Sequence, residues 1–424
     1  MRFASLSSRA LQTSRGVTLT GGESPFQSAK LRRSYLFTYK AFADVTARGS
    51  LFIVTLLAAR RLSPWEFGVF GLGTTLGWML AVATDFGVQM HLARAVAQAP
   101  GDARAMLARW WRVRLITSAL GLGLLVVALT AFGARRTLAV PVVLLALVYA
   151  VTSLVELINY FYRGLSRSDI ESTLTLWQRV ATLALGIGAL LWRPSVAVLA
   201  AALLVPPLAA LTWSARFAMR DGPANAPPPE DSFIHDVFPI GLGIVLSALY
   251  FRVDVLLVQL WLGTEAVAGY NAVFRLIDAL RLFPAAALAV VLPTLCRADD
   301  LRPLVQVSVA VTAFAIIAAA LLWALSDRVV TLAFGEHYRT AVPAFRILAL
   351  AFPLLSLNFA LTHQLIGWNR QHSYAVIAGA ALFANLALNA WLIPALSIEG
   401  AAWATLGTEL CVTSGCLVAL RARG

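Results

Sequence analysis

Residues 138–160 read LAVPVVLLALVYAVTSLVELINY, an apolar stretch with a single charged side chain, Glu156. A helix of this length spans about 34 Å, slightly more than the hydrocarbon core of a bilayer, so the stretch predicts a transmembrane helix. The rest of the chain has the same character, because 59% of its 424 residues are hydrophobic and only 13% are charged. Soluble domains carry about 25% charged residues. The composition therefore excludes an ordinary soluble enzyme, a disordered chain and a disulfide-stabilised scaffold.

Similar stretches recur on both sides of residues 138–160. Twelve spans are predicted, at residues 36–59, 67–89, 111–132, 138–160, 172–192, 195–215, 236–261, 266–292, 304–326, 341–366, 373–394 and 399–420. The predicted fold is all-α, a polytopic membrane protein with about 12 transmembrane helices. We expect a polar tail at 1–35, an N-terminal six-helix lobe at 36–215, a linker at 216–235 and a C-terminal six-helix lobe at 236–424.

The two predicted lobes share a short pattern at an equivalent hairpin turn. Residues 62–70 read LSPWEFGVF and residues 262–270 read LGTEAVAGY, so both run from leucine through an acid to glycine and an aromatic residue. The offset is about 200 residues, or six spans. Secondary transporters are built from such repeats, and their substrate site lies between the repeats near the bilayer midplane. The pattern therefore favours two pseudo-symmetric lobes.

The net charge of +13 follows the membrane orientation. Outside the spans, and counting Arg112 and Arg114 at the start of the third span, 20 Arg and Lys residues fall on the side of the N-terminus and 7 on the opposite side. Because cytoplasmic loops carry the excess of basic residues, both termini and the linker at 216–235 are predicted to be cytoplasmic. This distribution explains the basic charge without a nucleic-acid partner.

Motifs for catalysis or metal binding do not emerge from the sequence. The three cysteines form no CxxC pair, and the five histidines are scattered without an HExxH pattern. Zinc sites and disulfide frameworks depend on such spacings. We therefore predict no catalytic residue, no cofactor and no metal site.

Ionisable residues inside the spans are the candidates for function, because a charge in the bilayer is costly. Arg252 and Asp254 lie two residues apart, about 200° around a helix, which predicts that they point to opposite faces. Arg252 and Arg275 lie at similar distances from the turn at Gly263, about 17 Å away and near the midplane. Two guanidinium groups at one depth repel each other unless an anion lies between them.

Two interpretations of these charges remain open. One is internal salt bridging, of Arg275 with Asp254 or Asp278 and of Arg48 with Asp44. The other is a cationic cavity that binds an anionic ligand. For the cavity, the predicted substrate-binding residues are Arg252, Arg275, Arg281 and Arg48, and the predicted coupling or charge-pairing acids are Asp44, Asp85, Asp254 and Asp278.

Three stretches carry a resemblance to a known family. They are residues 62–70, residues 252–257 (RVDVLL) continuing through 269–272 (GYNA) to Pro293, and residues 385–409 with the segment IEGAA at 398–402. In this order they resemble Wzx-type polysaccharide flippases of the multidrug/oligosaccharidyl-lipid/polysaccharide exporter superfamily, over residues 36–420. The resemblance implies twelve helices in two lobes.

The resemblance also implies a function in the bacterial inner membrane. Such a protein moves an undecaprenyl-pyrophosphate-linked oligosaccharide from the cytoplasmic to the periplasmic leaflet, for O-antigen, capsule or exopolysaccharide assembly. Its implied partners are that lipid-linked substrate, membrane lipids and polysaccharide assembly proteins. In this family, cationic residues of the central cavity receive the pyrophosphate, a role that transfers here to Arg252, Arg275 and Arg281.

Two other functions make different demands on the sequence. One alternative is a drug or cation antiporter, or another lipid exporter, of the same fold. The antiporter predicts an acidic cavity, whereas the basic residues here lie centrally in the C-terminal half. A membrane glycan polymerase or ligase needs a sizeable outward loop with catalytic groups, but the largest predicted outward loop, 327–340, has only 14 residues. Both alternatives are therefore less favoured than a flippase, which makes and breaks no covalent bond.

Overall fold

The fold was analysed in a computed structural model of the chain. It describes residues 39, 46, 49–218, 233–288, 302–368 and 370–421, and only the backbone of residues 233–236 and 239. These ranges contain helices and no strand. After a helical segment at 49–61, the elements are α2 (Pro64–Asp85), α3 (Val88–Gln98), η1 (Pro100–Asp102), α4 (Ala103–Ala131), α5 (Arg136–Gly164), α6 (Ser168–Trp192), α7 (Val196–Ala218), α8 (Phe233–Leu262), α9 (Thr264–Leu280), α11 (Arg302–Ala324), α12 (Ser326–Phe334), η2 (Glu336–Ala341), α13 (Val342–Gly367), α14 (Gln371–Leu396) and α15 (Ile398–Arg421).

Ten helices of the described ranges are long and apolar enough to cross a membrane. They confirm the predicted all-α, polytopic membrane fold. The first and eighth predicted spans, 36–59 and 266–292, are described only in part. The number of spans seen in the described ranges is therefore smaller than the predicted twelve.

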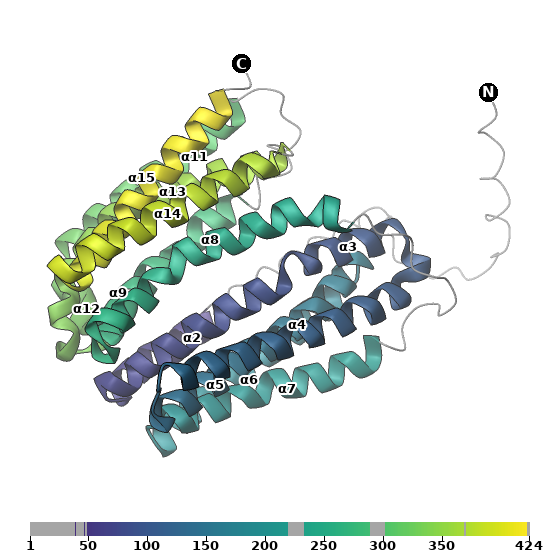
Figure 1. Cartoon of the computed structure of the whole chain (residues 1–424), viewed down its shortest axis with the longest axis horizontal. Helices are drawn as coiled ribbons and strands as arrows, with labels where there is room; N and C mark the ends of the chain where they lie inside the picture. The colour runs from purple at the N-terminus through teal and green to yellow at the C-terminus, as the bar shows by residue number, and fades with distance from the viewer. Residues whose placement is uncertain are drawn as a thin grey trace, which may run out of the picture.

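The helices form two groups that meet along α2, α8 and α9 (Figure 1). One group, the N-terminal lobe, contains α2 to α7, and the other, the C-terminal lobe, contains α8, α9 and α11 to α15. In Figure 1 the blue and teal helices lie on one side and the green and yellow helices on the other. Helix α2 contacts both α8 and α9. A side chain on one of these three helices can therefore reach across the junction between the lobes.

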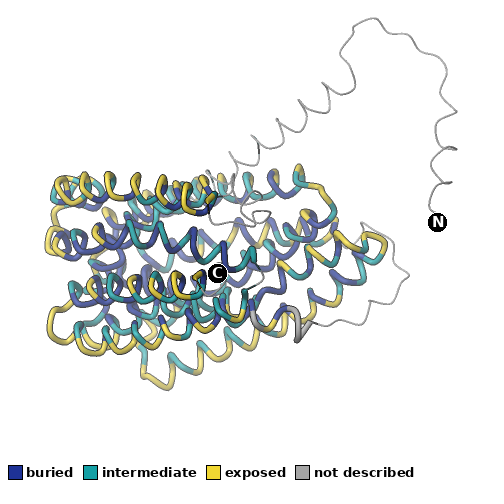
Figure 2. The backbone as a smooth tube through the Cα atoms, turned by 90° about the horizontal axis from the view of Figure 1, so that it is seen from above, coloured by how far each residue is buried: buried dark blue, intermediate teal, exposed yellow. Residues whose placement is uncertain are grey.

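The buried apolar residues differ between the two ends of the molecule. At the end with the turns at residues 62–63 and 263, which we call the tip end, one continuous core includes residues of both lobes. At the opposite end each lobe has its own core, which includes Leu107 and Phe161 in the N-terminal lobe and Leu361 and Val412 in the C-terminal lobe. Exposed positions follow the outer sides of the helices (Figure 2). The lobes are therefore joined by shared apolar packing at the tip end.

Close contacts between the two tips hold this end together. Gly68 of α2 lies so near the backbone carbonyl of Thr264 that a β-carbon at position 68 would overlap it. A residue without a side chain is what such a close helix approach requires. Nearby, Arg60 Nε donates to the Ala333 carbonyl at 3.0 Å, and Arg60 also donates to the Leu332 carbonyl. These carbonyls end α12, so a cation of the N-terminal lobe caps a helix of the C-terminal lobe.

Two segments predicted as loops are helical, which corrects the sequence analysis. The predicted loop 90–110 contains most of α3, all of η1 and the start of α4, and the predicted outward loop 327–340 consists largely of α12 and η2. Helix α3 buries Val88, Leu92 and Val96, each four residues from the next, against its own lobe. This spacing gives a short helix one apolar face. At 11 residues, this helix is too short to show the apolar length of a membrane span.

Helix α9 ends earlier than the predicted span. It stops at Leu280, a turn follows at Arg281, and helix resumes at residue 282. Pro284 accounts for the break, because proline has no N–H to donate and its ring collides with the carbonyl four residues earlier. Similarly, α7 extends to Ala218 and α8 begins at Phe233, so the ends of the predicted 216–235 linker are helical and residues 219–232 lie outside the described ranges.

Candidate functional site

Two arginines of the C-terminal lobe donate hydrogen bonds to consecutive threonines of the N-terminal lobe. Arg252 Nη2 of α8 donates to Thr75 Oγ1 at 3.2 Å, and Arg275 Nη2 of α9 donates to Thr74 Oγ1 at 3.2 Å. Both threonines lie on α2, near its middle. The arginines therefore lie at the junction between the lobes.

Arg252 is the more deeply buried of the two, with only 5% of its surface exposed. Its Nη2 also donates to Asn271 Oδ1 at 2.9 Å, and its guanidinium carbon lies 4.5 Å from the ring centre of Phe274. Its Nη1 is buried without a hydrogen-bond partner, and no carboxylate of the described residues forms an ion pair with it. A buried cation with a free donor can accept an additional anionic partner.

Arg275 and Arg281 share one carboxylate on α9. Asp278 Oδ2 lies 4.0 Å from Arg275 Nη1, and Asp278 Oδ1 lies 3.5 Å from Arg281 Nη1. The side chains of Arg275, Arg281 and Asp278 are 16%, 27% and 39% exposed, so they are more accessible than Arg252. Arg281 also lies over the ring of Phe251, 4.2 Å from its centre.

These four residues, Arg252, Arg275, Arg281 and Asp278, form the arginine cluster. It contains three cations and one carboxylate within ion-pair distance of two of them. The predicted alternative of internal salt bridging is thus correct for Arg275 with Asp278, and it does not extend to Arg252. The arginine cluster therefore carries more positive than negative charge.

Asp254 forms no ion pair with the arginine cluster, and its carboxylate has other hydrogen-bond partners. It is buried, its Oδ2 accepts a hydrogen bond from the Tyr270 hydroxyl, and its Oδ1 accepts from the Val255 amide at 2.8 Å. Tyr270 Oη in turn lies 3.3 Å from Thr405 Oγ1 of α15. Arg252 and Asp254 therefore have different hydrogen-bond partners, although both contact residues of α9.

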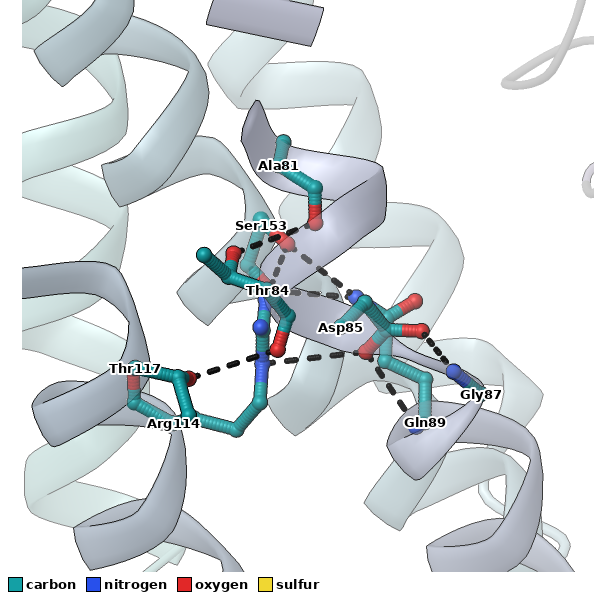
Figure 3. Close-up of polar contacts among 8 residues, drawn as sticks. All are labelled: Ala81, Thr84, Asp85, Gly87, Gln89, Arg114, Thr117 and Ser153. Carbon is teal, nitrogen blue, oxygen red and sulfur yellow. Dashed lines mark hydrogen bonds and ion pairs between the residues drawn. The ribbon is translucent and has the colours of Figure 1, made fainter. Parts of the chain in front are cut away.

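A second charged group lies inside the N-terminal lobe (Figure 3). Arg114 of α4 is fully buried, its Nε lies 3.6 Å from Asp85 Oδ1, and its Nη2 donates to Ser153 Oγ at 2.5 Å. Asp85 ends α2 and also accepts from the backbone amides of Gly87 and Gln89, at 3.2 and 3.3 Å. One carboxylate thus pairs with a buried cation and caps the start of α3.

The α2–α3 junction also contacts the other lobe. Phe86 and Gly87 both have positive φ angles, 47° and 82°, which allow the chain to turn between the two helices. The Phe86 ring lies 5.7 Å from the Phe238 ring of α8. A β-carbon at Gly241 of α8 would come within 2.6 Å of the Phe86 ring. The pair of Asp85 and Arg114 therefore supports a backbone turn that touches the C-terminal lobe.

The family of the chain follows from a sequence match. Residues 37–299 match the family described as polysaccharide biosynthesis protein, which is more than half of the chain. The chain belongs to this family. No curated protein matches the sequence. The predicted family resemblance is confirmed by this match, which covers residues 37–299 of the predicted 36–420.

Solved structures share the fold of this polysaccharide biosynthesis protein. The lipid II flippase MurJ, in an inward closed conformation, is 13% identical and has a TM-score of 0.72, with 90% of this chain and 87% of MurJ covered. An inward-facing multidrug resistance MATE family transporter of the MOP superfamily is 15% identical, with a TM-score of 0.69 and coverage of 88% and 94%. A point mutant of the Vibrio cholerae MATE transporter VcmN is 14% identical, with a TM-score of 0.66 and coverage of 93% and 98%. The family member therefore has the multi-pass fold of membrane flippases and transporters.

The predicted site residues of the family member fall into three places. Arg252, Arg275, Arg281 and Asp278 lie together in the arginine cluster, whereas Asp85 lies in the N-terminal lobe and Asp254 faces Tyr270. Arg48 and Asp44 lie outside the described residues. The sequence analysis missed the polar partners Thr74, Thr75 and Asn271.

Arg114 of the family member was also missed. It was counted among the cytoplasmic residues at the start of the third span, but it is fully buried. The buried residues of α4 are Ala103, Met106, Leu107, Trp110, Arg114 and Ser118. Their spacing of three or four residues is a signal in the sequence, because it places Arg114 on the inward face of the helix.

Proposed function

We propose that this protein is a flippase that moves an undecaprenyl-pyrophosphate-linked oligosaccharide across the bacterial inner membrane for O-antigen, capsule or exopolysaccharide assembly. The observation that supports it is the charge of the arginine cluster, in which three arginines share one nearby carboxylate at the junction between the lobes. A pyrophosphate group would neutralise the remaining positive charge. The family membership supports a role in polysaccharide biosynthesis.

Arginine suits this role for two reasons. Its planar guanidinium donates two parallel hydrogen bonds to a phosphate, and it keeps its charge when water is removed. In the cluster, Arg252 Nη1 and Arg275 Nε are buried without a hydrogen-bond partner among the described residues. A bound pyrophosphate would supply oxygen acceptors close to these donors. The free-energy cost of burying these donors without partners would then be offset when the substrate is bound.

Transport in this proposal uses alternating access, in which the lobes rock about the central site. The shared core at the tip end and the separate cores at the other end correspond to a state closed on the tip side. With both termini in the cytoplasm, the tip side is periplasmic. Phe86 and Phe238 also join the lobes at the cytoplasmic end, so substrate entry would require the α2–α3 junction and α8 to separate. Coupling to protons or sodium would use one of the acids Asp44, Asp85, Asp254 and Asp278.

The test is binding of undecaprenyl pyrophosphate to the purified protein in lipid nanodiscs. We expect Arg275→Gln to weaken binding at least about tenfold, which corresponds to 1.4 kcal/mol, without loss of protein yield. Arg275→Lys should restore part of the affinity, because it returns the charge but not the planar fork. Arg112→Gln is the control, since Arg112 is an exposed arginine of α4.

Three results would contradict the proposal. One is equal binding by wild type and by a folded variant in which Arg252, Arg275 and Arg281 are all changed to Gln. This result would show that these arginines do not bind the pyrophosphate. Export of cationic dyes with no lipid binding would favour a drug or cation exporter. Conversion of a lipid-linked glycan to longer or free glycan by the purified protein would favour a polymerase or ligase, and would end the description as a non-enzymatic transporter.

A further inference from the structure

Aromatic side chains from both lobes adjoin the arginine cluster. Trp78 of α2 and Phe251 of α8 pack edge to face, with ring centres 6.3 Å apart. Phe251 packs in the same way against Phe274 of α9, at 5.3 Å. Phe274 is buried, whereas Trp78 and Phe251 are both partly exposed. Trp78 and Phe251 are therefore the two partly exposed rings of this group, and we call these two residues the aromatic platform.

The platform and the cluster are parts of one surface. Trp78 follows Thr74 and Thr75 by four and three residues on α2, so all three lie on the same side of the helix, one turn apart. Those threonines are the hydrogen-bond partners of Arg275 and Arg252. On the other lobe, Arg281 lies directly over the Phe251 ring. An anion held by the arginines would therefore have an aromatic ring beside it.

This arrangement matches the chemistry of a sugar joined to a pyrophosphate. The C–H bonds on one face of a sugar ring carry partial positive charge, and they stack on the electron-rich face of an aromatic ring. The hydroxyl groups around the ring remain free to bond to arginine and threonine. In a lipid-linked oligosaccharide the first sugar is attached directly to the pyrophosphate, so the two groups must bind side by side.

We propose that Trp78 and Phe251 bind the first sugar ring of the lipid-linked glycan, next to the pyrophosphate in the arginine cluster. This inference rests on the proposed function and adds a sugar subsite to it. The platform recognises the ring face, and the selectivity for one sugar over another lies in the polar groups around it. Because Trp78 and Phe251 belong to different lobes, the sugar subsite is complete only when the lobes adjoin.

The experiment compares lipids with and without a sugar on the full-length protein in nanodiscs. The probes are undecaprenyl pyrophosphate and the same lipid carrying glucose, galactose or N-acetylglucosamine. For wild type we expect at least one sugar-bearing lipid to bind about fivefold or more tightly than the sugar-free lipid. Trp78→Ala should abolish this preference and leave the affinity for the sugar-free lipid within twofold, whereas Trp78→Phe should retain most of the preference.

The controls separate this inference from a purely structural role. Trp177→Ala removes a tryptophan that is 69% exposed on α6, a helix that packs against α5 and α7 of its own lobe, so the preference should persist. If Trp78→Ala weakens binding of all lipids equally, the tryptophan only packs the lobes together and the sugar subsite is wrong. If the sugar-free lipid binds but wild type shows no preference for any of the three sugars, the subsite fails while the proposed function stands. If no lipid binds, both fail.

Discussion

Arg252 and Asp254, two residues apart on α8, have different hydrogen-bond partners. Arg252 donates to Thr75 of the N-terminal lobe and to Asn271 of its own lobe, whereas Asp254 accepts from Tyr270 of its own lobe. The two charges are near in sequence, and neither is the other's hydrogen-bonded partner. Because Asp254 does not bond to Arg252, Arg252 Nη1 has no hydrogen-bond partner among the described residues and is available for an anion.

Double-mutant cycles should show that Asp254 is coupled more strongly to Tyr270 than to Arg252. Asp254 and Tyr270 are in contact, so the pair Asp254→Asn and Tyr270→Phe should give a coupling energy of about 0.5–3 kcal/mol. The pair Arg252→Gln and Asp254→Asn should give a clearly smaller value. The measurement is the unfolding free energy in lipid bicelles. A larger coupling for Arg252 with Asp254 than for Tyr270 with Asp254 would contradict the assignment.

Loss of Arg114 should destabilise the N-terminal lobe. Arg114→Met leaves Asp85 as a partly buried carboxylate without its cation, and breaking a buried pair costs about 3–5 kcal/mol. Thermal unfolding of the purified protein should show the loss. Adding Asp85→Asn should recover part of it, because the uncompensated charge is then gone. Arg112→Met, at an exposed position of the same helix, is the control. A double variant as unstable as Arg114→Met alone would disprove the pairing.

Arg60 should control how firmly the tip end is closed. Arg60→Gln removes charged donors from the Ala333 and Leu332 carbonyls, where each such bond contributes about 1.5–3 kcal/mol. Spin labels at positions 132 and 332, exposed on opposite lobes, should report a longer or broader distance distribution. The labels require a background with the three native cysteines replaced. Arg61→Gln, the exposed neighbour, should leave the distribution unchanged, and an identical response from both variants would show that the contact has no such role.

The orientation in the membrane can be tested with reporter fusions. The ratio of 20 basic residues to 7 predicts that Pro228 is cytoplasmic and that Glu336 is periplasmic. A fusion at Pro228 should therefore be active with a cytoplasmic reporter, and one at Glu336 with a periplasmic reporter. The reverse pattern would invert the direction of transport proposed above.

The sequence predicts the helices well because each membrane span must satisfy its own backbone hydrogen bonds. An apolar run such as 138–160 has few alternatives to a helix, and α5 indeed covers Arg136–Gly164. The short helices α3 and α12 escaped prediction because each is held by one apolar face and is too short to cross the bilayer. Their existence depends on the lobe against which they pack.

The charged residues of the site could be predicted from the sequence, but the residues to which they bond could not. Arg252, Arg275 and Asp278 stand out in the sequence because charge is rare in a span. Thr74 and Thr75 do not, since hydroxyl groups are common in such helices and usually bond to their own backbone. The bonds from Arg252 and Arg275 join residues 177 and 201 positions apart, a pairing that only the packing of α2 against α8 and α9 determines.

The two tips of the repeat no longer do the same work. Gly68 of the first tip fits against the Thr264 backbone of the other lobe, but a β-carbon at its counterpart Gly269 would lie 3.7 Å from Ala341 and Ile398 of its own lobe. The two tips are therefore not interchangeable. Two copies of the N-terminal lobe in one chain would each present a glycine at this contact, and neither would supply the Thr264 backbone that packs against it.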